Sequence, residues 1–266
     1  MLKLALALVM GALVVGSPGA RNIDGKEFDN EKIPVGAVGA RYIPSEDKRI
    51  KTRVQLDEGI YDYDLFGRND FEYFPLQLGN GSYKVYIFEN IKDTKYRLVK
   101  SQDVKAEIKD PMSIYLASIQ TINWNSDMAV IKKAAELTKG LKTDKDKINA
   151  IYNYVVKTIT YDYDKINHID STYVPDIEQA VKDGKGICYD YSAVLAAMLR
   201  SQNIPAKLIK GYSSNVKGYH AWNEVYSTDQ KRWIVIDTTY DSVMKHNGKT
   251  SKMEKEATQY QKSKEY

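Results

Sequence analysis

The sequence has little sulfur and little histidine. Among its 266 residues there is one cysteine, Cys188, and there are three histidines. A single cysteine excludes a disulfide framework within the chain, and one cysteine with three dispersed histidines does not give the ligand spacing of a zinc site. A phosphate-binding glycine loop is also missing from the sequence. We therefore expect neither a metal nor an organic cofactor.

Neither sign of charge is concentrated in one part of the chain. The 39 Lys and Arg residues against 35 Asp and Glu residues leave a formal net charge of +4. Lysines are interleaved with acidic residues, whereas a nucleic-acid-binding surface needs clustered basic residues. With 43% hydrophobic and 28% charged residues, the composition is typical of a globular protein. We expect solvated lysines and no nucleic-acid partner.

The long apolar run of the sequence lies at the N-terminus. Residues 1–20 contain Lys3, then an apolar stretch over 4–15, then small residues. This order predicts a secretory signal peptide. The run is short of the roughly 20 residues that a membrane-spanning helix needs, and an uncleaved anchor is the alternative. We expect a secreted or cell-surface protein.

Short β-prone runs separated by turn residues follow this segment. Runs of alternating or β-branched and aromatic residues lie at 52–56, 81–89 and 95–99. They predict a small, β-rich N-terminal domain over residues 21–120, resembling a β-sandwich. This region has no histidine and no cysteine, so we assign it a structural or recognition role.

Helical periodicity begins after the β-prone region. Ser126 or Asp127 is predicted to cap a helix over 129–137, Thr143 begins a second helix, and a third begins at or just after Cys188. Each of these segments repeats apolar residues at helical spacing, so each should bury one face.

Strand-like segments follow the third helix, at 206–212, 220–226 and 232–238. Helices followed by an antiparallel sheet predict an α+β fold. We expect this catalytic domain over residues 121–245 and a charged C-terminal tail over 246–266.

Cys188 is the candidate nucleophile. Unpaired backbone N–H groups and the positive end of the helix dipole favour an anion at the first turn of a helix, and therefore favour the thiolate. A thiolate also needs a base. His168 and His246 lie in polar loops and are expected to be solvated, whereas His220 opens a predicted strand.

A predicted hairpin brings an acid to this histidine. Strands 220–226 and 233–237 are expected to pair around the polar turn 227–231, which sets His220 opposite Asp237 or one residue away. Opposed residues have Cβ atoms about 4.5 to 5.5 Å apart. Cys188, His220 and Asp237 would then supply the nucleophile, the base and the orienting acid. A purely structural contact between strands is the alternative for the histidine and the aspartate.

The sequence around these residues resembles the transglutaminase-like superfamily of papain-like cysteine enzymes, in its secreted bacterial type. The resemblance covers about residues 127–242 and is carried by these blocks: Gly184-Lys185-Gly186-Ile187-Cys188-Tyr189-Asp190-Tyr191-Ser192, Ile204-Pro205-Ala206, Gly211-Tyr212, His220-Ala221-Trp222-Asn223-Glu224-Val225, and Trp233 followed by Asp237-Thr238-Thr239. It implies a papain-like core with Cys188, His220 and Asp237 as its catalytic triad. Thr238 stands where such proteins often have a proline.

Three further residues are candidates for supporting roles. Tyr161 matches a tyrosine that commonly precedes the cysteine block, and contributes either to an oxyanion hole or to packing. Trp222 either shields the imidazole from water or belongs to the core. Asp190 either orients the site or is a surface or structural carboxylate.

The resemblance implies an acyl-transfer or hydrolysis reaction through a thioester. Attack of the thioester by a lysine amine gives cross-linking, and attack by water gives peptide hydrolysis or deamidation. The expected partner is a protein or peptide substrate, including one associated with the cell wall. The alternative is a non-catalytic binding or assembly module of the cell envelope on the same scaffold.

Overall fold

The computed structural model describes residues 25–45 and 47–266, so the predicted signal peptide lies outside the described residues. The chain divides into two compact units, Met1–Asp110 and Pro111–Tyr266. The boundary therefore lies before the one expected near residue 120, because Tyr115 already packs on unit 2, with its ring 5.2 Å from that of Trp233. In the described ranges, no helix is both long enough and apolar enough to cross a membrane.

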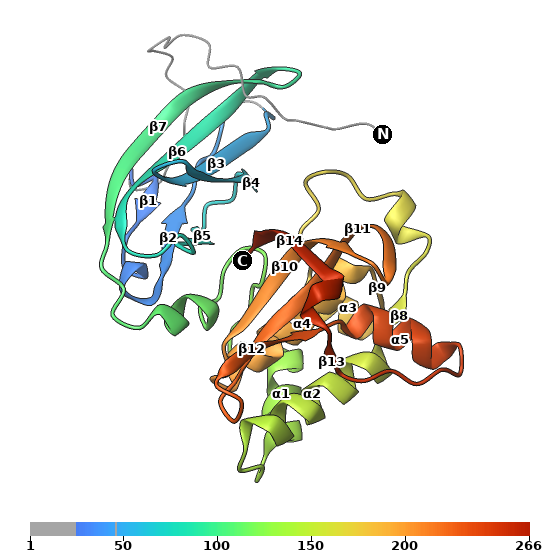
Figure 1. Cartoon of the computed structure of the whole chain (residues 1–266). Helices are drawn as coiled ribbons and strands as arrows, with labels where there is room; N and C mark the ends of the chain where they lie inside the picture. The colour runs from blue at the N-terminus through green and yellow to red at the C-terminus, as the bar shows by residue number, and fades with distance from the viewer. Residues whose placement is uncertain (1–24, 46) are drawn as a thin grey trace. The chain divides into compact units, whose positions relative to one another are not determined.

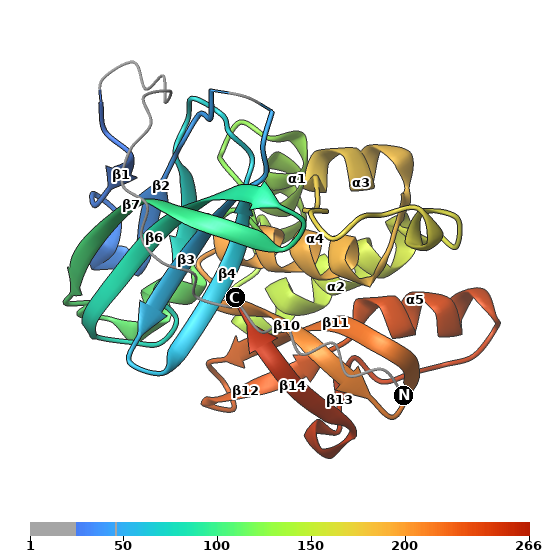
Figure 2. The same cartoon turned by 90° about the horizontal axis from the view of Figure 1, so that it is seen from above.

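Unit 1 consists of two antiparallel sheets, with strand orders β1-β2-β5 and β4-β3-β6-β7. Figure 2 shows the strands of the second sheet side by side. Its elements are β1 (Phe28–Asp29), the 3-10 helix η1 (Ile33–Val35), β2 (Ala37–Ala40), β3 (Ile50–Leu56), β4 (Gly59–Leu65), β5 (Glu72–Pro75), β6 (Gly81–Lys92) and β7 (Lys95–Ala106). The rings of Tyr63 and Phe74, one from each sheet, lie 4.7 Å apart. The three predicted β-prone runs are parts of β3, β6 and β7.

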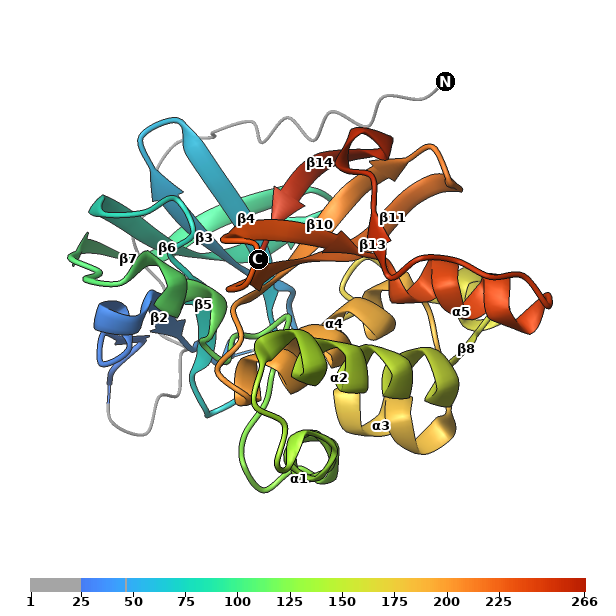
Figure 3. The same ribbon diagram turned by 60° about the horizontal axis from the view of Figure 1, so that its bottom comes forward.

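Unit 2 has helices and an antiparallel sheet, so the expected α+β class is confirmed. Its helical elements are η2 (Pro111–Tyr115), α1 (Ala129–Thr138), α2 (Asp144–Thr158), η3 (Lys165–Asn167), α3 (Ile177–Asp183), α4 (Cys188–Ser201), α5 (Thr238–His246) and η4 (Ala257–Gln259). Helix α4 is central, because every side chain from Tyr189 to Arg200 is buried. Figures 1 and 3 show α1 to α4 on one side of the sheet.

The sheet of unit 2 has the strand order β13-β12-β11-β10-β14. Its strands are β10 (Ala206–Ser213), β11 (Val216–Ser227), β12 (Arg232–Ile236), β13 (Glu254–Lys255) and β14 (Tyr260–Glu265), and a separate parallel pair consists of β8 (Thr160–Tyr161) and β9 (Lys185–Gly186). Asn223 ties the sheet to α4, since its Nδ2 donates to the carbonyl oxygens of Ser192 at 2.9 Å and Lys207 at 3.0 Å.

Two of the three helix starts predicted from the sequence agree with the structure. The hydroxyl of Thr143 caps α2 by accepting from the backbone N–H of Asp146 at 3.1 Å, and α4 begins at Cys188. The predicted cap of α1 is wrong, because Met128 is its N-cap and has no capping side chain. A carboxylate from α3 replaces the cap, as the N–H of Val130 donates to Glu178 Oε1 at 2.8 Å. Such a tertiary cap leaves no local signal.

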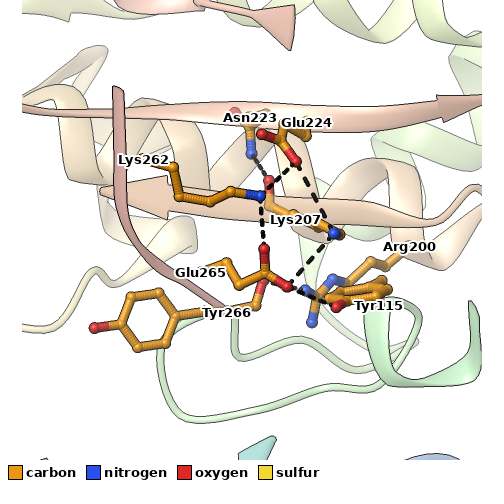
Figure 4. Close-up of polar contacts among 8 residues, drawn as sticks. All are labelled: Tyr115, Arg200, Lys207, Asn223, Glu224, Lys262, Glu265 and Tyr266. Carbon is orange, nitrogen blue, oxygen red and sulfur yellow. Dashed lines mark hydrogen bonds and ion pairs between the residues drawn. The ribbon is translucent and has the colours of Figure 1, made fainter. Parts of the chain in front are cut away.

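The expected C-terminal tail is instead part of the sheet. Strand β14 pairs antiparallel with β10, and β13 pairs with β12. The charges that suggested a solvated tail are used in ion pairs: Lys262 Nζ lies 3.1 Å from Glu224 Oε2 and 2.7 Å from Glu265 Oε2 (Figure 4). Glu265 also accepts from the hydroxyl of Tyr115 at 2.8 Å. A short, charged and hydrophilic strand of this kind is bound by its partners rather than by its own hydrophobicity.

The docking of β14 depends on a glycine in β10. A Cβ atom on Gly211 would lie 2.1 Å from the carbonyl oxygen of Gln261. We expect Gly211→Ala to lower the free energy of unfolding by about 1 to 3 kcal/mol, because the two strands must separate. Urea denaturation measures this, with Ser263→Ala on exposed β14 surface as the control, which should stay within about 0.5 kcal/mol of the parent. Equal stability of all three proteins would contradict the prediction.

Candidate active site

The candidate nucleophile is delivered by a short extended segment. After β9 the chain runs extended through Ile187 and turns into α4 at Cys188, which is partly exposed. Gly186 is required at this turn, because a Cβ atom there would lie 2.7 Å from the Cβ of Asp190. Cys188 thus lies at the first residue of the helix, where free N–H groups face an anion.

The buried carboxylate of Asp190 fixes this helix start. It accepts from the backbone N–H of Ile187 at 2.8 Å and from Lys165 Nζ at 2.9 Å, and it also accepts from the hydroxyl of Tyr173. The side chain has no exposed surface. The expectation that Asp190 is a surface carboxylate is therefore wrong. Asp190 links the segment that contains Lys165 and Tyr173 to the residue that precedes the thiol.

His220 and Asp237 are in direct contact. The Nε2 atom of His220 lies 2.8 Å from Asp237 Oδ2, and both side chains are buried. The predicted hairpin forms, but its register differs by two residues, because Asn223 pairs with Ile236. Extending this register places Asp237 opposite Trp222, so the contact with His220 is diagonal. A shift of two residues keeps both side chains on the same face.

Asp237 begins α5 instead of ending a strand. Its Oδ1 atom accepts from the backbone N–H of Tyr240 at 3.0 Å, so that Asp237 is the N-cap of the helix. Its Oδ2 atom accepts from His220 and, at 3.1 Å, from the hydroxyl of Tyr260. Thr238, which stands in place of the usual proline, is the first residue of α5.

The imidazole is held in its protonated form. Burial lowers the pKa of His220, but the hydrogen bonds to Asp237 and Cys188 and the negative charges of these two groups outweigh burial and raise the pKa to about 10. Because Nε2 faces Asp237, the remaining ring nitrogen, Nδ1, is left for the thiol. The raised pKa therefore keeps His220 as an imidazolium at neutral pH.

Tyr161 lies near the nucleophile, next to the segment that precedes α4. It pairs with Gly186 in the parallel β8–β9 ladder. Burial and, after it, the charge of Cys188 raise the pKa of Tyr161 to about 12, so the phenol is neutral and close enough to the thiolate to sense it. A neutral hydroxyl near the thiol is compatible with the donor role considered from the sequence.

Trp222 and Tyr260 form an aromatic layer next to the imidazole. The indole of Trp222 is 1% exposed, and its ring lies nearly parallel to that of His220 at 6.3 Å. Tyr260 also packs on Trp222, with ring centroids 5.1 Å apart. Trp222 belongs to a core cluster with Ile209 and Val235, which is the core role considered from the sequence.

The other two histidines are not at this site. His168 is exposed, and its Nδ1 lies 2.7 Å from the carbonyl oxygen of Asp164. His246 is at the end of α5, with Nδ1 2.7 Å from the carbonyl oxygen of Ser242. Sequence reasoning missed Tyr260, because residues 260–265 are polar and charged and show no apolar alternation that would mark a strand.

Comparison with known proteins agrees with the sequence resemblance. Residues 131–238 match the model of the transglutaminase-like superfamily. An archaeal relative, UPF0252 protein MJ1282 of Methanocaldococcus jannaschii, is 25% identical over 187 residues, which cover 60% of this chain and 51% of the relative. The chain thus spans about half the length of this relative.

Two solved structures are similar to this chain. A candidate cysteine protease from Cytophaga hutchinsonii aligns with a TM-score of 0.42 and 21% identity over 50% of this chain and 43% of that one. The periplasmic domain of TgpA from Pseudomonas aeruginosa aligns with a TM-score of 0.39 and 13% identity over 88% and 97%. The family match itself includes Cys188, His220 and Asp237, so the core of unit 2 resembles the transglutaminase-like superfamily, whose members are often cysteine enzymes.

Tyr260 is testable without knowledge of a substrate. In Tyr260→Phe, Asp237 Oδ2 loses one donor and carries more negative charge toward His220. We expect the pKa of His220 to rise by about half a pH unit, since the hydrogen bond is worth roughly 1 kcal/mol. NMR titration of the histidine rings in a Cys188→Ala background measures this, and Tyr219→Phe, at an exposed tyrosine, is the control. An unchanged or lower pKa would show that the hydroxyl does not act on Asp237.

Proposed function

Starting from a transglutaminase-like core over residues 131–238, we propose that the protein is a secreted cysteine enzyme that acts on carboxamide or peptide bonds of proteins. Cys188 is the nucleophile, His220 the acid and base, and Asp237 the orienting acid. The observation that carries the proposal is the buried hydrogen bond between His220 and Asp237, with Cys188 at the start of α4 near enough to raise the pKa of the imidazole.

The first half-reaction forms a thioester. The Cys188 thiolate attacks the carbonyl carbon, and a new C–S bond forms as negative charge develops on the oxygen. The backbone N–H of Cys188, at the free end of α4, is placed to stabilise this oxyanion, with the Tyr161 hydroxyl nearby. The C–N bond then breaks as the His220 imidazolium gives its proton to the departing nitrogen.

The second half-reaction releases the acyl group. Neutral His220 takes a proton from the acceptor, which attacks the thioester, and the C–S bond breaks to restore the thiolate and the imidazolium. An amine acceptor gives transfer, and water gives hydrolysis or deamidation. Asp237 stabilises the imidazolium in both steps and holds the ring orientation.

The proposed location is outside the cell or on its surface. The support comes from the leader-like order of residues 1–20 in the sequence. A protein substrate, including one associated with the cell wall, would be accessible there.

Dependence on the thiol tests the proposal. Purified protein and a Cys188→Ala control are incubated with casein and a labelled primary amine, and the products are analysed by mass spectrometry. We expect amine incorporation, deamidation or cleavage by the parent only, because the thioester cannot form without the thiol. Incorporation identifies transfer, whereas cleavage or deamidation without it identifies hydrolysis. Equal products from both proteins would contradict the enzyme and support a binding module.

The pH dependence follows from the histidine. Its pKa in the folded protein, about 10, is above the ordinary value of 6.5, so the imidazolium persists through neutral pH and is lost as the pH rises through about 10. We expect turnover to fall over that range. In Asp237→Asn, which still can cap α5, the raising effect of the carboxylate is removed and the fall should move to lower pH. Profiles of kcat/KM against pH measure both, and superimposable profiles would exclude control by His220.

A further inference from the structure

Lys210, in the middle of β10, is a mostly buried cation without a carboxylate partner. Within residues 25–45 and 47–266, its ammonium has no ion pair and instead lies over aromatic rings, 3.5 Å from the ring centroid of Tyr189 and 5.3 Å from that of Tyr266. Burial lowers the pKa of Lys210 to about 8, which reflects the missing counter-charge. The side chain is therefore mainly protonated at pH 7.

Three other partly buried lysines of unit 2 have carboxylate partners. Lys165 Nζ lies 2.9 Å from Asp190, and Lys255 is bonded to Asp241. Lys207 is the best comparison, because its ammonium also lies over aromatic rings, yet its Nζ is 3.4 Å from Glu265 Oε1. Among the residues that the structure describes, Lys210 differs from these three lysines in having no carboxylate beside its ammonium.

This cation lies next to the start of α4. Lys210 pairs across the sheet with Ala221, so its side chain is on the opposite face of the sheet from that of His220. It is α4 that brings Lys210 near the nucleophile, because the ring under its ammonium belongs to Tyr189, the residue after Cys188. Attraction to the Cys188 thiolate opposes the lowering of the lysine pKa. Cys188 is consequently the negatively charged group that acts on the pKa of Lys210.

The thiolate provides a negative charge near the Lys210 ammonium only in the free enzyme. When the thioester forms, the negative charge on sulfur is consumed in the new bond, and His220 gives up its proton. Lys210 then has only the faces of tyrosine rings, whereas a carboxylate on the bound acyl group would supply the missing charge. A partly desolvated site strengthens that attraction.

We propose that Lys210 forms an anion-binding subsite beside Cys188, which selects substrates that carry a carboxylate next to the bond under attack. This inference rests on the proposed function, since it names the substrate class of the same site. The carboxylate comes either from an acidic side chain or from a free carboxyl terminus, because the ammonium recognises both.

A pair of alkylating probes tests the subsite without a substrate. Iodoacetate and iodoacetamide both alkylate a thiolate, but only iodoacetate is an anion. At pH 7, we expect the ratio of their rates at Cys188 to fall about tenfold in Lys210→Met, because the cation that attracts the carboxylate is gone. Lys210→Arg should keep the ratio. Lys185→Met is the matched control, since Lys185 lies in β9 just before Cys188 but is exposed, and its ratio should not change.

The ratio separates this inference from its alternatives. A parallel fall of both rates in Lys210→Met, with the ratio unchanged, would mean that Lys210 only stabilises the thiolate, and would overturn the subsite. Slow alkylation of the parent by both probes would contradict the proposed enzyme. The ratio of the two rates would still show whether Lys210 attracts the carboxylate of iodoacetate. Circular dichroism of each variant verifies the fold.

Peptide substrates distinguish the two sources of the carboxylate. Matched glutamine peptides carry Glu or Gln beside the reactive residue, and each is made with a free or an amidated carboxyl terminus. A preference for Glu that is lost in Lys210→Met identifies a side-chain carboxylate, and a preference for the free terminus identifies a terminal one. Equal rates for all four peptides would contradict the proposal.

Discussion

The buried carboxylate of Asp237 is bonded by three elements of the second half of unit 2. Its two oxygens accept from the imidazole of β11, from the first turn of α5 and from the phenol of β14. One side chain thus begins a helix, contacts His220 and holds an edge strand. Because a buried carboxylate is costly without partners, these elements stabilise one another through it. The position of the imidazole is consequently a property of the whole sheet.

A second buried carboxylate, Asp190, joins the elements around Cys188. It ties the start of α4 to Lys165 and Tyr173. Neither of these partners belongs to a regular strand or an α-helix, so the acid fixes an irregular segment against a rigid helix. The thiol and the imidazole are each oriented by an aspartate with three donors. The site is therefore assembled from two independently braced halves.

The sequence predicted the parts of the fold that local chemistry specifies. Thr143 caps its helix, Cys188 begins another, and the alternation in β11 and β12 places His220 and Asp237 on one face. It failed where the partner is distant. The cap of α1 is a glutamate from α3. The charged segment after residue 246 forms a strand by pairing with β10, with ion pairs to β10 and β11 and a hydrogen bond from Tyr115 of η2. Lys210 was missed for a similar reason, since an isolated lysine in a strand gives no sign of which charges surround it.

The contribution of β14 also sets an order of events during synthesis. Cys188, His220 and Asp237 all leave the ribosome before Tyr260, the third donor to the carboxylate, exists. A nascent chain that stops short of this strand would have a thiol and an imidazole but an incompletely braced aspartate and an open edge on β10. The carboxylate therefore has all three of its donors only after β14 has docked on β10.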